Sequence, residues 1–181
     1  MAKFWFCLFT ISLTTLTFTL QSFHVMSSEA TIIEVCNRTP DPSLCQTCLH
    51  SDPKSATADI KGLGMISIAC GTRDANKLYT DTNNVYSSTK DPALHNLLDE
   101  CWWRFVGARD NIESAGRFLT DKGADAAKLA ITRDAMPMVS YCSDLFKKNP
   151  SVAVPKNIID ETNVVSTDCQ IILGILNNIR P

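Results

Sequence analysis

The chain has 181 residues, a length typical of a single domain, and 45% of them are hydrophobic, which is enough for a buried core. Its 17 Lys and Arg residues nearly balance its 19 Asp and Glu residues, so the formal net charge is −2. This balance, together with the lack of a recurring basic patch, argues against a nucleic-acid partner.

The first 28 residues have the layout of a secretory signal peptide. Lys3 supplies a positive charge, residues 4–20 form an apolar run diluted by Thr and Ser, and Ser27 and Ser28 offer small residues for cleavage. The run is shorter than the ~20 residues that a membrane-spanning helix needs. We therefore expect a mature domain over residues 29–181, with no membrane association after cleavage.

Two short helices are predicted at the start of the mature domain, over residues 30–38 and 42–51. The turn between them contains Asp41 and Pro42. Asp41 can cap the second helix, and Pro42 can occupy its first position. This pattern is typical of an αα-hairpin.

A long helix is expected over residues 55–88. Apolar residues follow the helical period in its first half, at Ile60, Leu63, Ile66 and Cys70. Its second half is polar, and three glycines in the first half weaken the pattern.

The next helix has the clearest start, because Asp91 can be its N-cap and Pro92 its first residue. The segment 121–123, Asp-Lys-Gly, marks its end. Between them, apolar residues keep to one face, at Leu94, Leu97, Leu98, Cys101, Phe105, Ala108, Ile112, Ala115 and Leu119.

Trp102 and Trp103 flank that apolar face, and two interpretations are open. Trp is enriched in binding hot spots, so the pair could contact a partner. Packing of both rings against the edge of the fold is the interpretation that we favour.

Two more helices are predicted, over residues 124–147 and from residue 155 onward. Pro137 lies inside the first and removes a backbone donor, so we expect a kink or break near Met136. In the second, apolar and small residues recur at alternating spacings of four and three residues along one face. These residues are Ile158, Thr162, Val165, Cys169, Ile172, Leu176 and Ile179. Long helices joined by short links favour an all-α, up-down-up-down four-helix bundle that follows the hairpin.

Seven of the eight cysteines lie in the mature domain, and some should pair in an oxidising compartment. A bridge between Cys36 and Cys45 would close about ten residues around the hairpin turn and contribute roughly 2.7 kcal/mol. A bridge between Cys101 and Cys142 would join consecutive long helices, close about 42 residues and contribute roughly 4 kcal/mol. The sequence alone leaves this connectivity open.

The remaining mature cysteines have less defined roles. Cys70 and Cys169 each lie on an apolar helix face; we favour two buried thiols, with a third bridge between them as the alternative. Cys45 and Cys48 have C-x-x-C spacing, but a helical hairpin is not the usual setting of a redox site. Cys48 is therefore expected to be a spare thiol.

No catalytic residue, metal site or cofactor is predicted. His50 and His95 are the histidines of the mature domain, and neither lies in an H-E-x-x-H motif. No G-x-S-x-G motif occurs.

Asn37 begins an N-x-[ST] sequon and is a candidate glycosylation site, although Pro40 follows the sequon directly.

The cysteine pattern, Cys36-x8-Cys45 followed by Cys101 and Cys142, resembles that of the plant invertase and pectin methylesterase inhibitor family. The signal peptide and the helix order are similar too. The resemblance covers nearly all of the mature domain and implies a four-helix bundle with an N-terminal helical hairpin, held by two disulfides. The strings that carry it are Asp-Pro-Lys-Ser at 52–55, Asp-Pro-Ala-Leu at 91–94, and the segments 97–101 and 141–146; residues 52–64 look closest to the allergen-like invertase inhibitors of pollen.

The resemblance implies a secreted inhibitor, not an enzyme, that binds pectin methylesterase or a cell-wall or vacuolar invertase and occludes its cleft. Invertase inhibitors of the family can carry a Pro-Lys-Phe motif between the second and third bundle helices, where residues 121–125 here read Asp-Lys-Gly-Ala-Asp. This difference favours pectin methylesterase, whereas the pollen-like strings favour invertase. The residues that contact the target are not predicted. The expected location is the apoplast or cell wall, with the vacuole as an alternative.

Two other functions are compatible with the same helices. One is a small-ligand carrier, with a cavity beside the small or polar residues Ala127, Ala130 and Thr162. The other is a pollen or seed protein that has no enzyme target.

Overall fold

The computed structural model describes residues 29–180, and every regular element within them is a helix. The predicted all-α fold is thereby confirmed. The predicted signal peptide lies outside the described residues. None of the described helices is long and apolar enough to cross a membrane.

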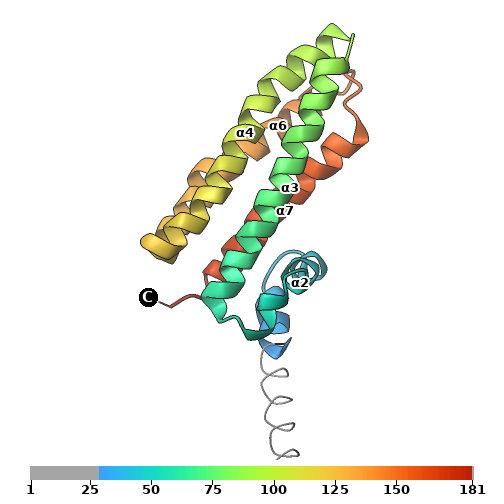
Figure 1. Cartoon of the computed structure of the whole chain (residues 1–181). Coiled ribbons are helices and arrows are strands. Elements are labelled where there is room, and N and C mark those ends of the chain that lie inside the picture. Colours follow the sequence, from blue (N-terminus) through green and yellow to red (C-terminus); the bar gives the residue numbers. More distant parts are fainter. Residues whose placement is uncertain (1–28, 181) are drawn as a thin grey trace, which may run out of the picture.

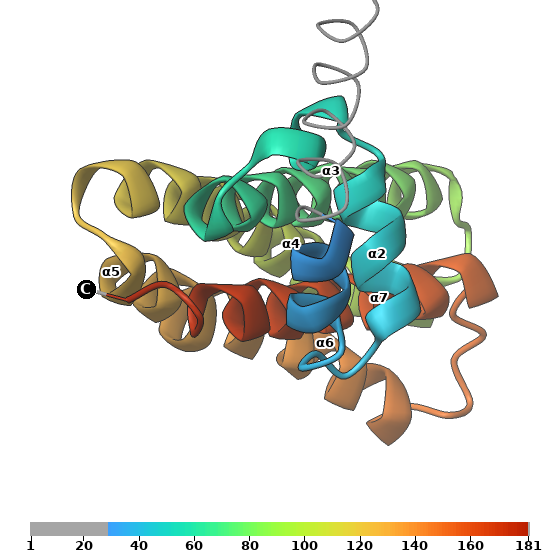
Figure 2. The ribbon, with the colours of Figure 1, turned by 90° about the horizontal axis from the view of Figure 1, so that it is seen from below.

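Four rods form the bundle, and Figure 1 shows that consecutive rods run in alternate directions. The helical hairpin precedes them and packs beside α3 and α7 (Figure 2). The hairpin consists of helical residues 29–36 and α2 (Pro42–His50), and a short 3-10 helix, η1 (Pro53–Thr57), follows it. The rods are α3 (Ile60–Ser88), α4 (Pro92–Asp121), the joined segments α5 (Ala124–Leu129), η2 (Ala130–Ala135) and α6 (Met136–Lys148), and α7 (Lys156–Leu176).

Aspartate caps determine where the early helices begin. Asp41 accepts a hydrogen bond from the Leu44 backbone N–H at 2.9 Å, and Asp91 accepts one from Ala93 at 2.9 Å, as predicted. The first long helix starts at Ile60 instead of the predicted residue 55. It starts late because Asp59 provides its cap, after the separate helix η1 has ended.

We expect Asp59→Ala to lower the free energy of unfolding by about 1 kcal/mol, the usual cost of losing a helix cap. Asp59 Oδ1 accepts a hydrogen bond from the Gly62 N–H at 2.7 Å, and this donor has no helical partner without it. Urea unfolding would measure the change. Asp59→Asn keeps an acceptor oxygen and serves as the control, so equal losses in the two variants would contradict the role of the cap.

The third rod remains helical past Pro137, so the predicted break at Met136 does not occur. Instead, the π-helical segment η2 leads directly into α6, whose first residues are Met136 and Pro137. A π turn is wider than an α turn, which relieves the crowding between a proline ring and the carbonyl one turn earlier. The proline is thus accommodated by a local change of helical pitch.

Two apolar clusters hold the fold together. The larger lies inside the bundle, and it contains the predicted buried faces of α4 and α7, including Phe105, Ile112, Val165 and Ile172. The smaller joins the hairpin to α3 and α7, through residues that include Ile32, Leu49, Leu63, Ile66 and Ile175. The hairpin is therefore docked on the bundle by its own core.

Three disulfides link the described elements. Cys36 pairs with Cys45 across the hairpin turn, with a Cα–Cα distance of 5.5 Å. Cys101 on α4 pairs with Cys142 on α6, also at 5.5 Å. The third bridge, which the sequence did not suggest, joins Cys48 on α2 to a cysteine of α3, Cys70, at 6.0 Å.

The suggested bridge between Cys70 and Cys169 does not form, and Cys48 is not a spare thiol. Cys70 faces the hairpin and belongs to the smaller cluster, whereas Cys169 lies in the bundle core. Cys169 is a free, buried thiol. Burial raises its pKa to about 12, so it stays protonated and unreactive.

Candidate functional site

Aromatic and arginine side chains gather on the outside of α4 and across its seams with α3 and α6. We call this region the aromatic surface. Seven residues make it: Tyr79 and Tyr86 from α3, Trp102, Trp103, Arg104 and Arg109 from α4, and Tyr141 from α6.

Trp103 is the most prominent residue of the aromatic surface, because 64% of it is exposed to solvent. Its ring meets the edge of the Trp102 ring with a centroid distance of 4.4 Å. Exposed aromatic residues on a rigid helix are typical of the anchors of protein interfaces.

Trp102 has the opposite environment, since it packs into the seam between α4 and α3. Its ring centroid lies 5.7 Å from that of Tyr79 and 6.5 Å from that of Tyr86. The packing interpretation that we favoured for both tryptophans therefore describes Trp102, while Trp103 faces the solvent.

The aromatic partners on α3 were missed by the sequence analysis. Tyr79 and Tyr86 are seven residues apart on α3, as are Trp102 and Arg109 on α4, so each pair lies on one side of its helix. Arg109 places its guanidinium 5.0 Å from the centre of the Tyr79 ring. The matching spacing on two consecutive helices is the signal that could have revealed this contact.

On the other side of Trp103, α4 meets α6 through a polar cluster. The Arg104 guanidinium lies 3.6 Å above the Tyr141 ring, and the Tyr141 hydroxyl donates a hydrogen bond to Glu100. That hydrogen bond raises the pKa of Tyr141, so the hydroxyl remains a donor at neutral pH. A shallow pocket of about 320 Å³ adjoins the cluster and is lined by Glu100 and Asn149, among others.

The backbone beneath the aromatic surface is held in place covalently. Cys101 directly precedes the two tryptophans and is bonded to Cys142, the residue that follows Tyr141. The parts of the surface on α4 and α6 are therefore linked covalently. A surface that is rigid before binding loses less conformational entropy on association.

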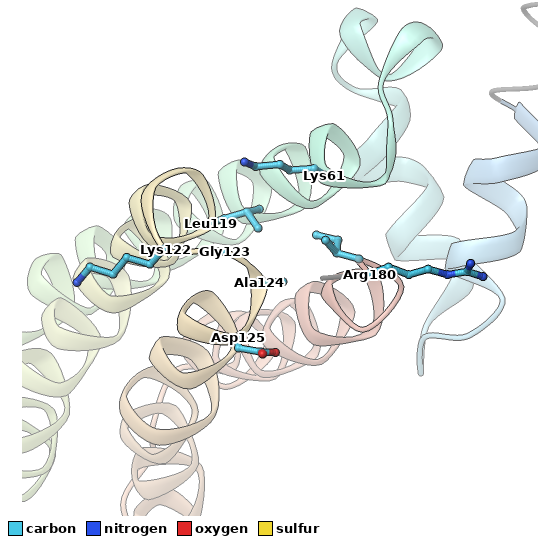
Figure 3. Close-up of a pocket in the computed structure, with 8 residues that line it drawn as sticks. Lys61, Leu119, Lys122, Gly123, Ala124, Asp125 and Arg180 are labelled. Carbon is cyan, nitrogen blue, oxygen red and sulfur yellow. The ribbon is translucent and has the colours of Figure 1, made fainter.

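The loop after α4, which the sequence analysis singled out, lies at a basic end of the bundle. Lys61, Lys122 and Arg180 line a pocket of about 420 Å³ there, together with one acidic residue, Asp125. Figure 3 shows that their side chains point in different directions and do not meet at one point. Lys122 places its ammonium 4.5 Å from the centre of the Phe118 ring, on its own helix. This end of the bundle thus has positive charge but no formed anion site.

The two histidines of the mature domain contact neighbouring side chains. His50 lies 3.5 Å from Glu29, and His95 stacks on Tyr86 with ring centroids 4.3 Å apart. Among the described residues, no cluster of His, Cys, Asp and Glu could hold a metal ion. The candidate glycosylation site, Asn37, is exposed near the hairpin turn.

The residues suggested to line a small-ligand cavity lie in the core of the bundle. Ala127, Ala130 and Thr162 are buried in the bundle. The Thr162 hydroxyl donates to the Ile158 carbonyl at 2.6 Å, so the helix satisfies it internally. The pockets described above are lined by other residues.

Comparisons with known proteins agree with this architecture. Residues 30–175 match the family model described as plant invertase/pectin methylesterase inhibitor. The chain is 43% identical over 146 residues to the cell wall / vacuolar inhibitor of fructosidase 1 of Arabidopsis thaliana, covering 77% of this chain and 68% of that one. It is 29% identical over 150 residues to the pectinesterase inhibitor of Actinidia deliciosa, covering 83% and 79%.

A solved structure shares the same fold. The crystal structure of a pectin methylesterase inhibitor from Arabidopsis thaliana superposes with a TM-score of 0.63 at 18% identity, covering 84% of this chain and 97% of that one. A mutant form of a pectin methylesterase inhibitor from Arabidopsis gives a TM-score of 0.70 at 19% identity, covering 81% and 95%. At these identities the likeness concerns the fold.

Proposed function

The chain belongs to the plant invertase/pectin methylesterase inhibitor family, and on that premise we propose that it inhibits an extracellular invertase by binding it. The observation that carries the proposal is the aromatic surface, where the exposed Trp103 lies on a helix that a disulfide joins to its neighbour. The protein supplies no catalytic group in this proposal. It acts by covering the target's cleft.

The preference for invertase comes from the relatives. Identity is 43% to the inhibitor of fructosidase 1, whereas it is 29% both to the inhibitor of fructosidase 2 and to the pectinesterase inhibitor. Inhibitors that share more sequence are expected to share more of their contact surface. This argument outweighs the missing Pro-Lys-Phe motif, which pointed to pectin methylesterase.

Steric occlusion accounts for inhibition without a covalent step. A glycosidase needs an open cleft with two carboxyl groups beside the scissile bond. A standard interface buries about 800 Å² on each partner, which a helical face of this size can provide. Trp103 would be the central anchor, with Arg104 and Arg109 on either side as donors to acceptor groups of the cleft.

Inhibition of pectin methylesterase is the second candidate function. The absence of a Pro-Lys-Phe motif in residues 121–125 favours it. The same helical surface would then cover a different cleft.

The extracellular location is part of the proposal. It is supported by the signal-like residues 1–28 and by the presence of three disulfides, which persist in oxidising compartments. A vacuolar location is compatible with the same export signal.

Parallel titrations would test the proposal. Mature oxidised protein, residues 29–181, would be titrated against a plant cell-wall invertase and a plant pectin methylesterase. We expect invertase activity to fall linearly to zero at a one-to-one ratio, with the esterase unaffected. Loss of esterase activity alone would select the second candidate, and full activity of both enzymes at micromolar protein would overturn the inhibitor function.

A further inference from the structure

Two pairs of carboxyl groups face each other across the seam between α3 and α7. Asp74 on α3 lies opposite Asp168 on α7, and Asp81 on α3 lies opposite Glu161 on α7. The residues are seven positions apart on each helix, so the pairs occupy successive heptads of the antiparallel helices. Like charges in such a seam repel each other unless a cation or a proton lies between them.

A lysine neutralises the pair formed by Asp81 and Glu161. Lys77 Nζ donates to Asp81 Oδ2 at 2.6 Å and also donates to Glu161. The hydrogen bond from Lys77 lowers the pKa of Asp81. Burial nevertheless raises the pKa of Glu161, and the contact with Lys77 opposes that shift.

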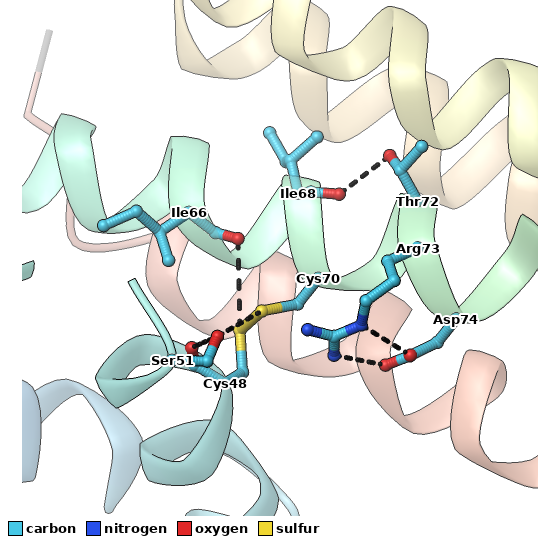
Figure 4. A network of polar contacts seen from close by, with 8 residues as sticks. All are labelled: Cys48, Ser51, Ile66, Ile68, Cys70, Thr72, Arg73 and Asp74. Atoms are coloured by element: carbon cyan, nitrogen blue, oxygen red, sulfur yellow. Dashed lines mark hydrogen bonds and ion pairs between the residues drawn. A yellow bond between two sulfur atoms is a disulfide. The ribbon is translucent and has the colours of Figure 1, made fainter. Parts of the chain in front are cut away.

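The pair formed by Asp74 and Asp168 has no shared cation. The guanidinium of Arg73 donates to both oxygens of Asp74, at 3.0 Å each, and Figure 4 shows this two-pronged contact. Arg73 therefore satisfies Asp74 and leaves Asp168 without a cationic partner of its own. Asp168 is only 3% exposed, and its Oδ2 atom has no hydrogen-bond partner among the described residues.

The other surroundings of Asp168 are neutral. On α3, a Cβ atom at Gly71 would lie 3.5 Å from the Asp168 Cβ and 3.5 Å from Ile112 of α4, so the backbone of α3 approaches closely here. The hairpin contributes Ser51 and the Cys48–Cys70 bridge to this region of α3 (Figure 4). Arg73 and Asp74 are the charged groups that act on Asp168, and the protonated Cys169 thiol follows it on α7.

We propose that Asp168 is protonated in the folded protein, and that loss of this proton weakens the contact between α3 and α7. An ionised Asp168 would face the Asp74 carboxylate, and the guanidinium of Arg73 would be the single cation beside these two negative charges. The consequence reaches the hairpin, because Ile171 and Ile175 of α7 lie on the same side of the helix as Asp168 and form the hairpin's docking cluster. The seam is thus a pH-sensitive element of the fold.

The direction of the pH effect follows from linkage. Burial, reinforced by the charge of Asp74, raises the pKa of Asp168 from 3.8 to about 7. The folded state therefore binds one more proton than the unfolded state in this interval. The unfolding constant should rise about tenfold per pH unit between about pH 4 and pH 7 and then level off. The stabilisation is fully present below the pKa that Asp168 has in the unfolded state. It is lost as the pH rises through the pKa that Asp168 has in the folded state.

The test compares the mature protein with Asp168→Asn and with the control Asp160→Asn, which removes an exposed carboxyl group of the same helix. Urea midpoints would be measured from pH 4 to pH 8, together with hydrogen exchange of the α2 amides. We expect the midpoint of the wild type to fall and α2 exchange to accelerate as the pH rises. Asp168→Asn should lose this component of the pH dependence, and Asp160→Asn should keep it.

A direct measurement on the unmodified protein decides the matter if Asp168→Asn does not fold. Carboxyl carbon NMR, assigned to Asp168, should show a protonated group at pH 6. Titration of this carboxyl near pH 4, or identical pH slopes for the wild type and Asp168→Asn, would overturn the proposal.

Discussion

Replacing Trp103 with Ala should weaken inhibition of the target enzyme by at least about 30-fold, the effect of losing a hot-spot residue worth about 2 kcal/mol. The free energy of unfolding should change little, because 64% of Trp103 is exposed and the side chain adds little to the core. Inhibition constants and urea unfolding of the same preparations would measure both effects.

Two further variants make the Trp103 result specific to the aromatic surface. Leu129→Ala removes another exposed apolar side chain, 51% exposed on α5, and should leave inhibition unchanged. Trp102→Ala should lower stability, since Trp102 packs between α4 and the Tyr79 and Tyr86 rings of α3. Equal inhibition by the wild type and Trp103→Ala would place the contact surface elsewhere on the bundle.

Removing the bridge between α4 and α6, with Cys101→Ala and Cys142→Ala together, should lower the free energy of unfolding by about 4 kcal/mol. The bridge spans a sequence separation of 41 residues, so breaking it gives the unfolded chain considerably more conformational freedom. Urea unfolding under oxidising conditions would measure the loss. Inhibition should weaken too, because the bridge fixes the backbone beside Trp102 and Trp103.

Cys169→Ala is the matched control for the loss of a buried sulfur atom without the loss of a bridge. Cys169 is a free thiol in the bundle core, so its truncation should cost only about 1 kcal/mol. A loss in the double variant no larger than in Cys169→Ala would show that the bridge contributes nothing beyond packing.

Local features of this protein could be predicted from the sequence. The caps at Asp41 and Asp91 are of this kind, because a cap depends on residues within one turn. The buried faces of α4 and α7 followed from apolar spacing, since a helix turns its residues toward one side with a fixed period. The length of the helices and the short links between them then favoured a bundle.

Other features depend on which helix faces meet, and only the tertiary structure decided them. Cys70 lies on the side of α3 that receives the hairpin, so it pairs with Cys48 and leaves Cys169 free. Adjacent residues on a helix point about 100° apart, so Trp102 enters a seam while Trp103 faces solvent.

The proximity of Asp74 and Asp168 also depends on which helix faces meet. Ninety-four residues separate these two positions in the sequence, and no local pattern links them. Their proximity arises because α7 returns antiparallel along α3 in one particular register, set by the apolar faces of both helices. The sequence thus determined most of the helices and the buried sides of α4 and α7, whereas the contacts between helices determined the disulfide partners, the exposed anchor and the proximity of Asp74 and Asp168.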